Sequence, residues 1–223
     1  MKEFDAELKE VYEEEKREEL IKEFAKPSYE HVLEKNDFKT ADIPYHVLLE
    51  TQEWWDFRNR ILKKDGYRCS NCGKGPTESK QKNDFDISID NWTGHYWIDE
   101  EYNQDYYKDK KIHIWWPGGP TEPNIIVVAD KPYHLHAHHK HYIVGRLPWE
   151  YEEKDLTTLC NWCHWEFHQN NKVNVYSESK GVLHSVSYTI CGRCKGAGWF
   201  PEYVHVQGGI CFECGGHPYR VTK

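Results

Sequence analysis

Long apolar runs are absent from this chain. No stretch approaches the ~18 consecutive apolar residues of a membrane-spanning helix, and 30% of the 223 residues are charged. Nothing in the sequence resembles a secretory signal peptide either. These absences exclude an integral membrane protein and predict a soluble, cytoplasmic protein with no membrane partner.

An excess of positive charge is missing as well. The 29 Lys and Arg residues are outnumbered by 37 Asp and Glu residues, for a net charge of −8. This balance excludes a protein that coats nucleic acid through its overall charge. Residues 1–30 hold 11 of the acidic side chains, whereas residues 54–68 hold five basic and two acidic ones. The sequence therefore predicts a locally basic face with acidic appendages, which is compatible with DNA binding.

The chain has no cysteine outside a CxxC pair. The four pairs are Cys69 and Cys72, Cys160 and Cys163, Cys191 and Cys194, and Cys211 and Cys214. Disulfide frameworks seldom space their cysteines in this way, whereas two zinc sites of four thiolates use every sulfur. Reduced thiolates also agree with a cytoplasmic location. Spacing leaves two partners open for the 160/163 pair, namely 69/72 and 191/194.

Composition divides the chain into five segments. They are a charged N-terminal helix (1–27), a helical lead-in with a first zinc knuckle (28–75), an acidic aromatic insertion (76–132), a histidine-rich hairpin and helix (133–171), and a four-cysteine zinc module (172–223). Apolar spacing predicts a helix over Glu53–Lys64, and alternation predicts strands over 86–90, 112–115, 125–129 and 172–176.

Two of these segments have alternative roles. The N-terminal helix either docks on the body of the protein or serves as an arm for a protein partner or for self-association. The insertion either extends the sheet, which is the interpretation we favour, or acts as a specificity or inhibitory element through its negative charge.

Seven of the fourteen histidines lie between Tyr133 and His168. Side chains alternate along an extended strand, so the neighbours His138 and His139 face opposite sides and can serve a metal and a water separately. His164 and His168 are four residues apart, which places both imidazoles on one face of a helix. We therefore expect this stretch to be the centre of the site.

Four motifs in this order carry a family resemblance: DGYRCSNCG at 65–73, LHAHH at 135–139, PWEY at 148–151, and DLTTLCNWCH at 155–164 followed by His168. They resemble the HNH, or ββα-metal, endonucleases, in the variant whose CxxC pairs bracket the catalytic hairpin. The resemblance covers roughly residues 50–75 and 133–170. The tail, with CGRCKGAG at 191–198, resembles half of the CxxCxGxG zinc modules of chaperone cofactors, or a small zinc ribbon.

The HNH resemblance implies an α+β fold with a ββα-metal core, to which a β-rich acidic insertion and a ribbon-like zinc module are added. It implies His139 as the general base and one divalent ion (Mg²⁺, Mn²⁺, Ni²⁺ or Zn²⁺) held by His138, His164 and His168. Three imidazoles favour a transition metal. Asp155 stands where the family has its central Asn, and we expect it to orient His139 through a hydrogen bond.

The order of the motifs in the family also assigns the cysteines. It places one structural Zn²⁺ on Cys69, Cys72, Cys160 and Cys163, and leaves a second structural Zn²⁺ to Cys191, Cys194, Cys211 and Cys214. Four thiolates leave no open coordination position, so both sites are expected to be structural.

Five basic side chains are candidates for phosphate contacts: Arg58, Lys63, Lys64, Lys140 and Arg146. His134, His136 and His141 are expected to support the strand. Together these features predict a metal-dependent endonuclease that hydrolyses phosphodiester bonds in double-stranded DNA with low sequence specificity, as the nuclease subunit of a defence, phage or mobile-element system. The alternative is a non-catalytic double-zinc module that binds DNA or protein.

Overall fold

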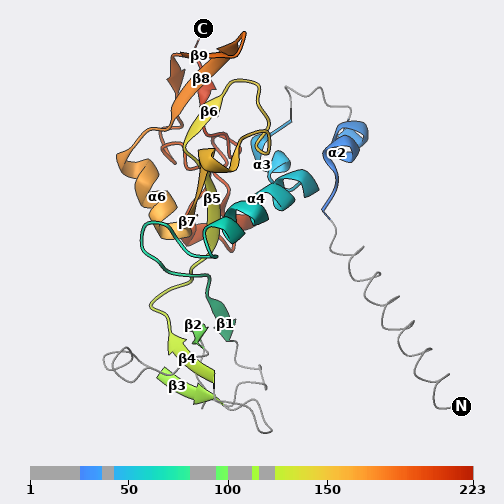
Figure 1. Ribbon diagram of the computed structural model, residues 1–223. Helices are drawn as coiled ribbons and strands as arrows, with labels where there is room; N and C mark the ends of the chain where they lie inside the picture. Colours follow the sequence, from blue (N-terminus) through green and yellow to red (C-terminus); the bar gives the residue numbers. More distant parts are fainter. Residues whose placement is uncertain (1–25, 37–42, 81–93, 100–111, 116–123, 223) are drawn as a thin grey trace, which may run out of the picture.

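The computed structural model describes residues 26–36, 43–80, 94–99, 112–115 and 124–222. Helices and strands are mixed, which confirms the predicted α+β class (Figure 1). The described chain begins with three helices, α2 (Tyr29–Asn36), α3 (Tyr45–Leu48) and α4 (Gln52–Lys64). The expected N-terminal helix lies in residues 1–27, almost all of which fall outside the described part of the chain.

Helix α4 carries the apolar face that organises the core. It begins where the Thr51 hydroxyl accepts a hydrogen bond from Trp54 N at 3.4 Å, and it ends at Asp65, before Gly66 with a φ of +64°. Its buried side chains are Trp54, Phe57, Ile61 and Leu62. They pack in two clusters that also hold Leu156 and Leu159. The helix predicted over Glu53–Lys64 is therefore confirmed to within one residue.

The histidine-rich segment forms two antiparallel strands followed by a helix. Strand β5 (Leu135–His139) pairs with β7 (Leu156–Cys160), and α6 (Asn161–Asn170) follows β7 directly. The connection between the strands contains β6 (His141–Ile143) and the 3-10 turn η2 (Glu153–Asp155). Figure 1 shows β5 and β7 between α4 on one side and α6 on the other. This arrangement gives the two faces of β5 different surroundings.

Strand β6 continues into a second sheet. It pairs in parallel with β8 (Asn174–Ser179), which pairs antiparallel with β9 (Val182–Ser185). The strand predicted over 172–176 therefore exists, shifted toward the C-terminus by two to three residues.

The insertion forms a sheet of its own, and our expectation that it extends the hairpin sheet was wrong. Its described strands are β1 (Glu78–Lys80), β2 (Gly94–Asp99), β3 (Ile112–Trp115) and β4 (Asn124–Val128), arranged antiparallel in the order β1-β2-β4-β3. The chain leaves and returns at one place, because Thr77 N donates to Tyr133 O and Tyr133 N donates to the Thr77 hydroxyl, each at 2.9 Å. The strand predicted over 86–90 lies outside the described residues.

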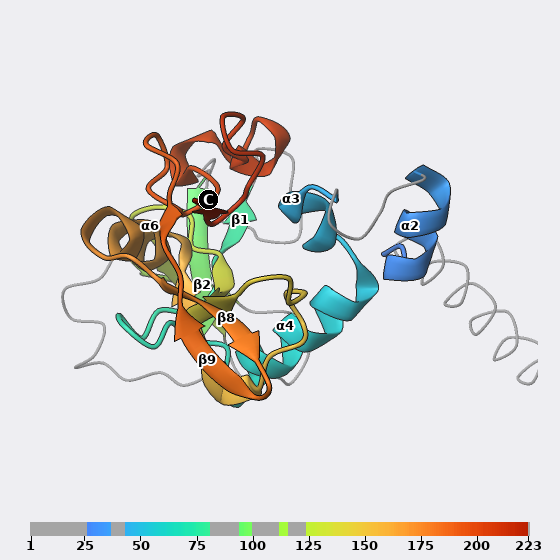
Figure 2. The same ribbon diagram turned by 90° about the horizontal axis from the view of Figure 1, so that it is seen from above.

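The C-terminal module consists of turns around the last four cysteines. It contains the 3-10 turns η3 (Pro201–Tyr203) and η4 (Gln207–Gly209), and it is closed by the short pair β10 (Tyr188–Thr189) and β11 (Arg220–Val221). Figure 2 shows this module, coloured red, beside α6 and α3. Among the described residues, no helix is long and apolar enough to cross a membrane.

Candidate metal centre

The first four-cysteine cluster joins α4's C-terminal loop to the hairpin. The sulfurs of Cys69, Cys72, Cys160 and Cys163 all lie within 4.8 Å of one another. Residue spacing alone allowed either of two CxxC pairs as the partner of Cys160 and Cys163, and the structure places Cys69 and Cys72 there. Burial opposes ionisation of Cys69, but hydrogen bonds from the surrounding backbone outweigh it and lower its pKa to about 7. Burial raises the pKa of Cys160 and Cys163, so it is the geometry that favours zinc: four sulfurs this close together form the usual ligand set of a structural zinc.

The second four-cysteine cluster is formed by Cys191, Cys194, Cys211 and Cys214, also within 4.8 Å. A hydrogen bond from Cys214 lowers the pKa of Cys194 to about 5. The turn glycines are needed for close approach: a Cβ at Gly198, whose φ is +77°, would lie 2.7 Å from the Gly216 carbonyl oxygen. This cluster could therefore hold the second structural zinc.

Three histidines form a separate cluster between β5 and α6. The ligand atoms of His138, His164 and His168 lie within 4.8 Å of one another, and the three residues are only 3%, 8% and 4% exposed. Both ring nitrogens of His138 are buried without a hydrogen-bond partner. Buried polar atoms almost always have one, so His138 is an exception that needs an explanation. A divalent cation held by the three imidazoles would give one of these two nitrogens a partner.

The protonation of the three imidazoles is suited to metal binding. Burial lowers the pKa of His138 to about 3 and that of His168 to about 4, and it lowers the pKa of His164 as well. All three rings are therefore neutral near pH 7, which is the form of histidine that binds a metal. A hydrogen bond with the Lys195 backbone also orients His168.

His139 lies on the opposite face of β5, as the alternation predicts. Its ring stacks on Trp54, with centroids 5.5 Å apart, and its Nε2 lies 2.9 Å from the Pro148 carbonyl oxygen. A carbonyl only accepts, so Nε2 carries the proton and Nδ1 keeps the lone pair. Burial lowers the pKa of His139 to about 4. The ring is therefore a neutral proton acceptor near pH 7.

The expected hydrogen bond between Asp155 and His139 is not formed. The Asp155 carboxylate accepts from Glu152 N at 3.1 Å and closes a capping box around η2. The ring donor of His139 is used by Pro148 instead. Burial, the largest influence, lowers the pKa of His139, and Asp155 opposes this shift only through its charge.

The five predicted phosphate-binding side chains are dispersed. Arg58 Nη2 donates to Leu135 O at 2.7 Å beside the histidines, and Lys140 lines a cavity next to His138. Lys64 Nζ instead donates to Glu153 O and Leu156 O, Arg146 pairs with Glu178, and Lys63 is exposed on the last turn of α4. Only Arg58 and Lys140 are thus positioned next to the histidine cluster.

The three additional histidines stay outside the ligand cluster. His136 stacks on Trp199 at 4.4 Å, His134 is exposed, and His141 lies between Tyr151 and Tyr176. This agrees with their expected supporting role.

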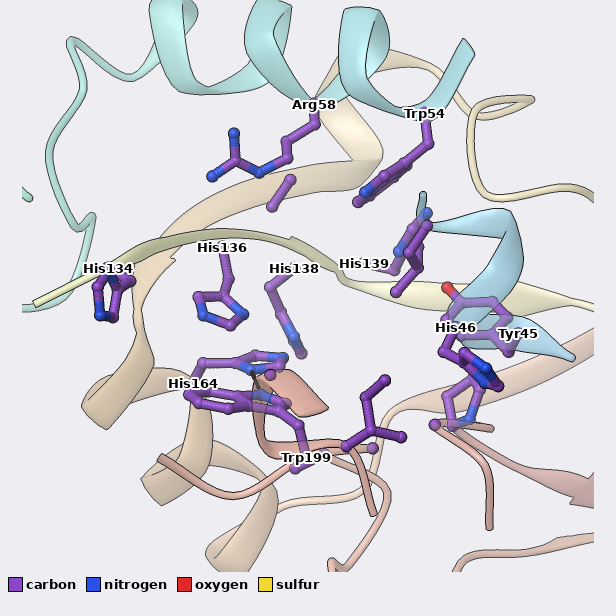
Figure 3. A pocket seen from close by; sticks show the side chains of 18 of the residues that line it. Tyr45, His46, Trp54, Arg58, His134, His136, His138, His139, His164 and Trp199 are labelled. Atoms are coloured by element: carbon purple, nitrogen blue, oxygen red, sulfur yellow. Dashed lines mark hydrogen bonds between the residues drawn. The ribbon is translucent and has the colours of Figure 1, made fainter. Parts of the chain in front are cut away.

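The sequence interpretation missed the contribution of the C-terminal module. Trp199 Nε1 donates to His164 Nδ1 at 3.0 Å, and His46 Nδ1 donates to Gly215 O at 2.9 Å. The module is therefore packed against the histidines and forms a wall of their cavity (Figure 3). The sequence signal for this contact is Trp199, which directly follows the turn Gly196-Ala197-Gly198. The residues around it do not indicate which histidine it contacts.

The Trp199 contact leads to a test of metal binding. A neutral imidazole has one lone pair, so His164 gives it either to the Trp199 N–H or to a metal. Trp199→Phe keeps an aromatic ring on His136 and removes the competing donor. Since one hydrogen bond contributes about 0.5–1.5 kcal/mol, we expect the histidine cluster to bind Ni²⁺ roughly 2- to 10-fold more tightly, measured by calorimetric titration of the zinc-loaded chain.

The matched control is Trp97→Phe, because the Trp97 N–H donates to Gly75 O at 3.1 Å, away from the histidines. It should leave the affinity for Ni²⁺ unchanged. Equal affinities of wild type and Trp199→Phe would show that Trp199 does not compete for His164.

Comparison of the chain with known proteins found no relative. No protein-family model matches the chain, and neither the curated proteins nor the solved structures contain a match.

Proposed function

We propose that this chain is a metal-dependent endonuclease of the HNH type, which hydrolyses phosphodiester bonds in nucleic acid. The observation that carries the proposal is the cluster of His138, His164 and His168 together with His139, the neighbour of His138 on β5. Two antiparallel strands followed by a helix, with one ligand on β5 and two on α6, match the arrangement that the motif resemblance implies. The closed cysteine cluster at the base of the hairpin supports it further.

The roles of the side chains follow from their surroundings. His139 Nδ1, left free by the hydrogen bond of Nε2 to Pro148, takes the proton from the water that attacks phosphorus. Arg58, which makes no ion pair with a described carboxylate, holds a non-bridging phosphate oxygen. A divalent ion held by His138, His164 and His168 would stabilise the charge that develops on the phosphate and the leaving oxygen. Three neutral imidazoles favour Zn²⁺, Ni²⁺ or Mn²⁺ as this ion.

Incubation with substrates tests the proposal. The zinc-loaded chain is mixed with supercoiled plasmid, linear duplex and single-stranded DNA in Mg²⁺, Mn²⁺, Ni²⁺ or Zn²⁺. We expect internal cleavage with at least one ion, and faster cleavage with a transition metal than with Mg²⁺, read out by gel electrophoresis. Substrates that stay intact under every ion would contradict the proposal.

A further inference from the structure

The reacting groups of the proposed nuclease lie below the surface. His138 and His139 are each 3% exposed, and the two ligands on α6 are at most 8% exposed. Figure 3 shows the reason: Arg58 and Trp54 reach in from α4 on one side of β5, and Trp199 lies below His164 on the other. A phosphate must therefore enter between two walls to reach these histidines.

The space between the walls is small. One wall comes from α3 and α4, with Tyr45, Trp55 and Arg58, and the other from the C-terminal module, with Trp199. The cavity has a volume of about 360 Å³, near the lower end of the ~300–1,000 Å³ of ordinary small-molecule pockets. A DNA duplex, whose major groove alone is about 12 Å wide, is far larger than such a space.

A second cavity is also lined by His138 and has a volume of about 610 Å³. Its polar lining includes Asn71, Thr157, Asn170 and Lys140, together with the carboxylate of Glu166. Hydroxyl, amide and ammonium groups are the usual contacts of sugars and phosphates. His138 thus lines both an aromatic cavity, with Tyr45, Trp55 and Trp199, and a more polar one.

We propose that this site takes an unpaired nucleic-acid strand, with a nucleotide in the aromatic cavity and the continuing backbone in the polar cavity that His138 also lines. This inference rests on the proposed nuclease function and replaces the expectation of a double-stranded substrate. An unpaired strand is narrow enough to enter, and its bases are free to stack on aromatic rings. Enzymes with buried sites of this kind act on single strands or on nucleotides taken out of the duplex.

The charge in the aromatic cavity fits a single phosphate, because its carboxylate, Glu50, is paired with Lys26 at 2.7 Å and leaves Arg58 as the free cation of the described lining. Arg58 is largely buried, and its bonded partners are the uncharged Leu135 carbonyl and Asn59 side chain. Burial also lowers its pKa, which reflects the cost of keeping this cation away from water. A phosphate oxygen offsets that cost through a charge-assisted hydrogen bond.

Binding assays test this inference without cleavage. The full zinc-loaded His139→Gln variant is titrated against a fluorescein-labelled single-stranded DNA, the matching single-stranded RNA and the matching DNA duplex, each of about 12 nucleotides or base pairs, within the roughly 4–16 nucleotides of known single-strand sites. We expect at least one single strand to bind about tenfold more tightly than the duplex, measured by fluorescence anisotropy. The two single-strand arms distinguish DNA from RNA. A duplex that binds as tightly as both single strands overturns the inference.

A pair of arginine variants separates the site from general charge. In the same background, Arg58→Gln should weaken single-strand binding about tenfold, because it removes the cation from the cavity wall. Arg60→Gln is the matched control, since Arg60 is on the same helix, exposed, and paired with Glu153 at 3.5 Å. Equal weakening by both variants would also overturn the inference.

The outcomes distinguish this inference from the function on which it rests. Cleavage of duplex together with preferential duplex binding would leave the nuclease proposal intact and reject the unpaired-strand site. Preferential single-strand binding without cleavage under any ion would instead support the unpaired-strand site and reject the nuclease proposal.

Discussion

Replacement of His139 by Gln is expected to reduce the rate of phosphodiester cleavage by roughly 100- to 10,000-fold, the usual contribution of a general base. The side-chain amide of Gln can still donate to the Pro148 carbonyl oxygen, which His139 Nε2 contacts at 2.9 Å. It cannot accept a proton from water, because an amide is not basic near pH 7. The measurement is the single-turnover cleavage rate at saturating metal.

The control for this variant is His141→Gln, which makes the same change two residues further along. His141 contacts Tyr151 and Tyr176 and does not line either cavity beside His138. We expect its cleavage rate to stay within about twofold of wild type, as for a partly exposed side chain outside the site. Affinity for Ni²⁺ should be the same in both variants, since neither residue is in the three-histidine cluster.

An unchanged rate in His139→Gln would remove the general-base assignment. It would favour the alternative of a non-catalytic double-zinc module, in which the three histidines hold a further structural ion. A lower rate accompanied by a lower affinity for Ni²⁺ would instead indicate that the substitution disturbs β5.

The elements that could be predicted from the sequence are those determined by short-range geometry. The apolar face of α4 follows from spacing within one helix, and the pair His164 and His168 follows from a four-residue repeat on α6. CxxC pairs are local in the same sense, because two thiolates three residues apart already point to one metal. Even here, the partner of Cys160 and Cys163 needed the order of the motifs or the structure.

The features that could not be predicted depend on contacts between distant parts of the chain. Trp199 reaches His164 only because the C-terminal module packs on α6, and no periodicity in either segment encodes that contact. The Asp155 carboxylate accepts a hydrogen bond from the backbone N–H of Glu152 and not from the ring of His139. Glu152 is three residues away, whereas a contact with His139 depends on how distant parts of the chain pack. The insertion forms its own sheet because Thr77 and Tyr133 join its two ends, a pairing across 56 residues.

Replacement of Cys160 by Ser is expected to lower the zinc content from two ions per chain to one and to destabilise the hairpin. Cys160 is fully buried, and its sulfur accepts from Cys163 N at 3.4 Å at the start of α6. Structural zinc in zinc-finger peptides contributes about 10–16 kcal/mol, which is comparable to the ~5–15 kcal/mol total stability of a typical domain. We therefore expect loss of cooperative thermal unfolding for the segment that includes α4, β5, β7 and α6, with zinc measured by elemental analysis.

The matched variant is Cys211→Ser, in which a buried thiol of the second cluster is replaced by the same residue. It should also lose one zinc, but the first cluster, which joins the residues after α4 to the hairpin, stays intact. Cys211→Ser should therefore retain cooperative unfolding, and its histidine cluster should still bind Ni²⁺. In Cys160→Ser the cluster should not bind Ni²⁺, because His164 and His168 lie on the helix that the first zinc anchors. Two zinc ions retained in Cys160→Ser would show that Cys160 is not a ligand. Equal loss of Ni²⁺ binding in both variants would show that the C-terminal module is as necessary to the metal centre as the hairpin.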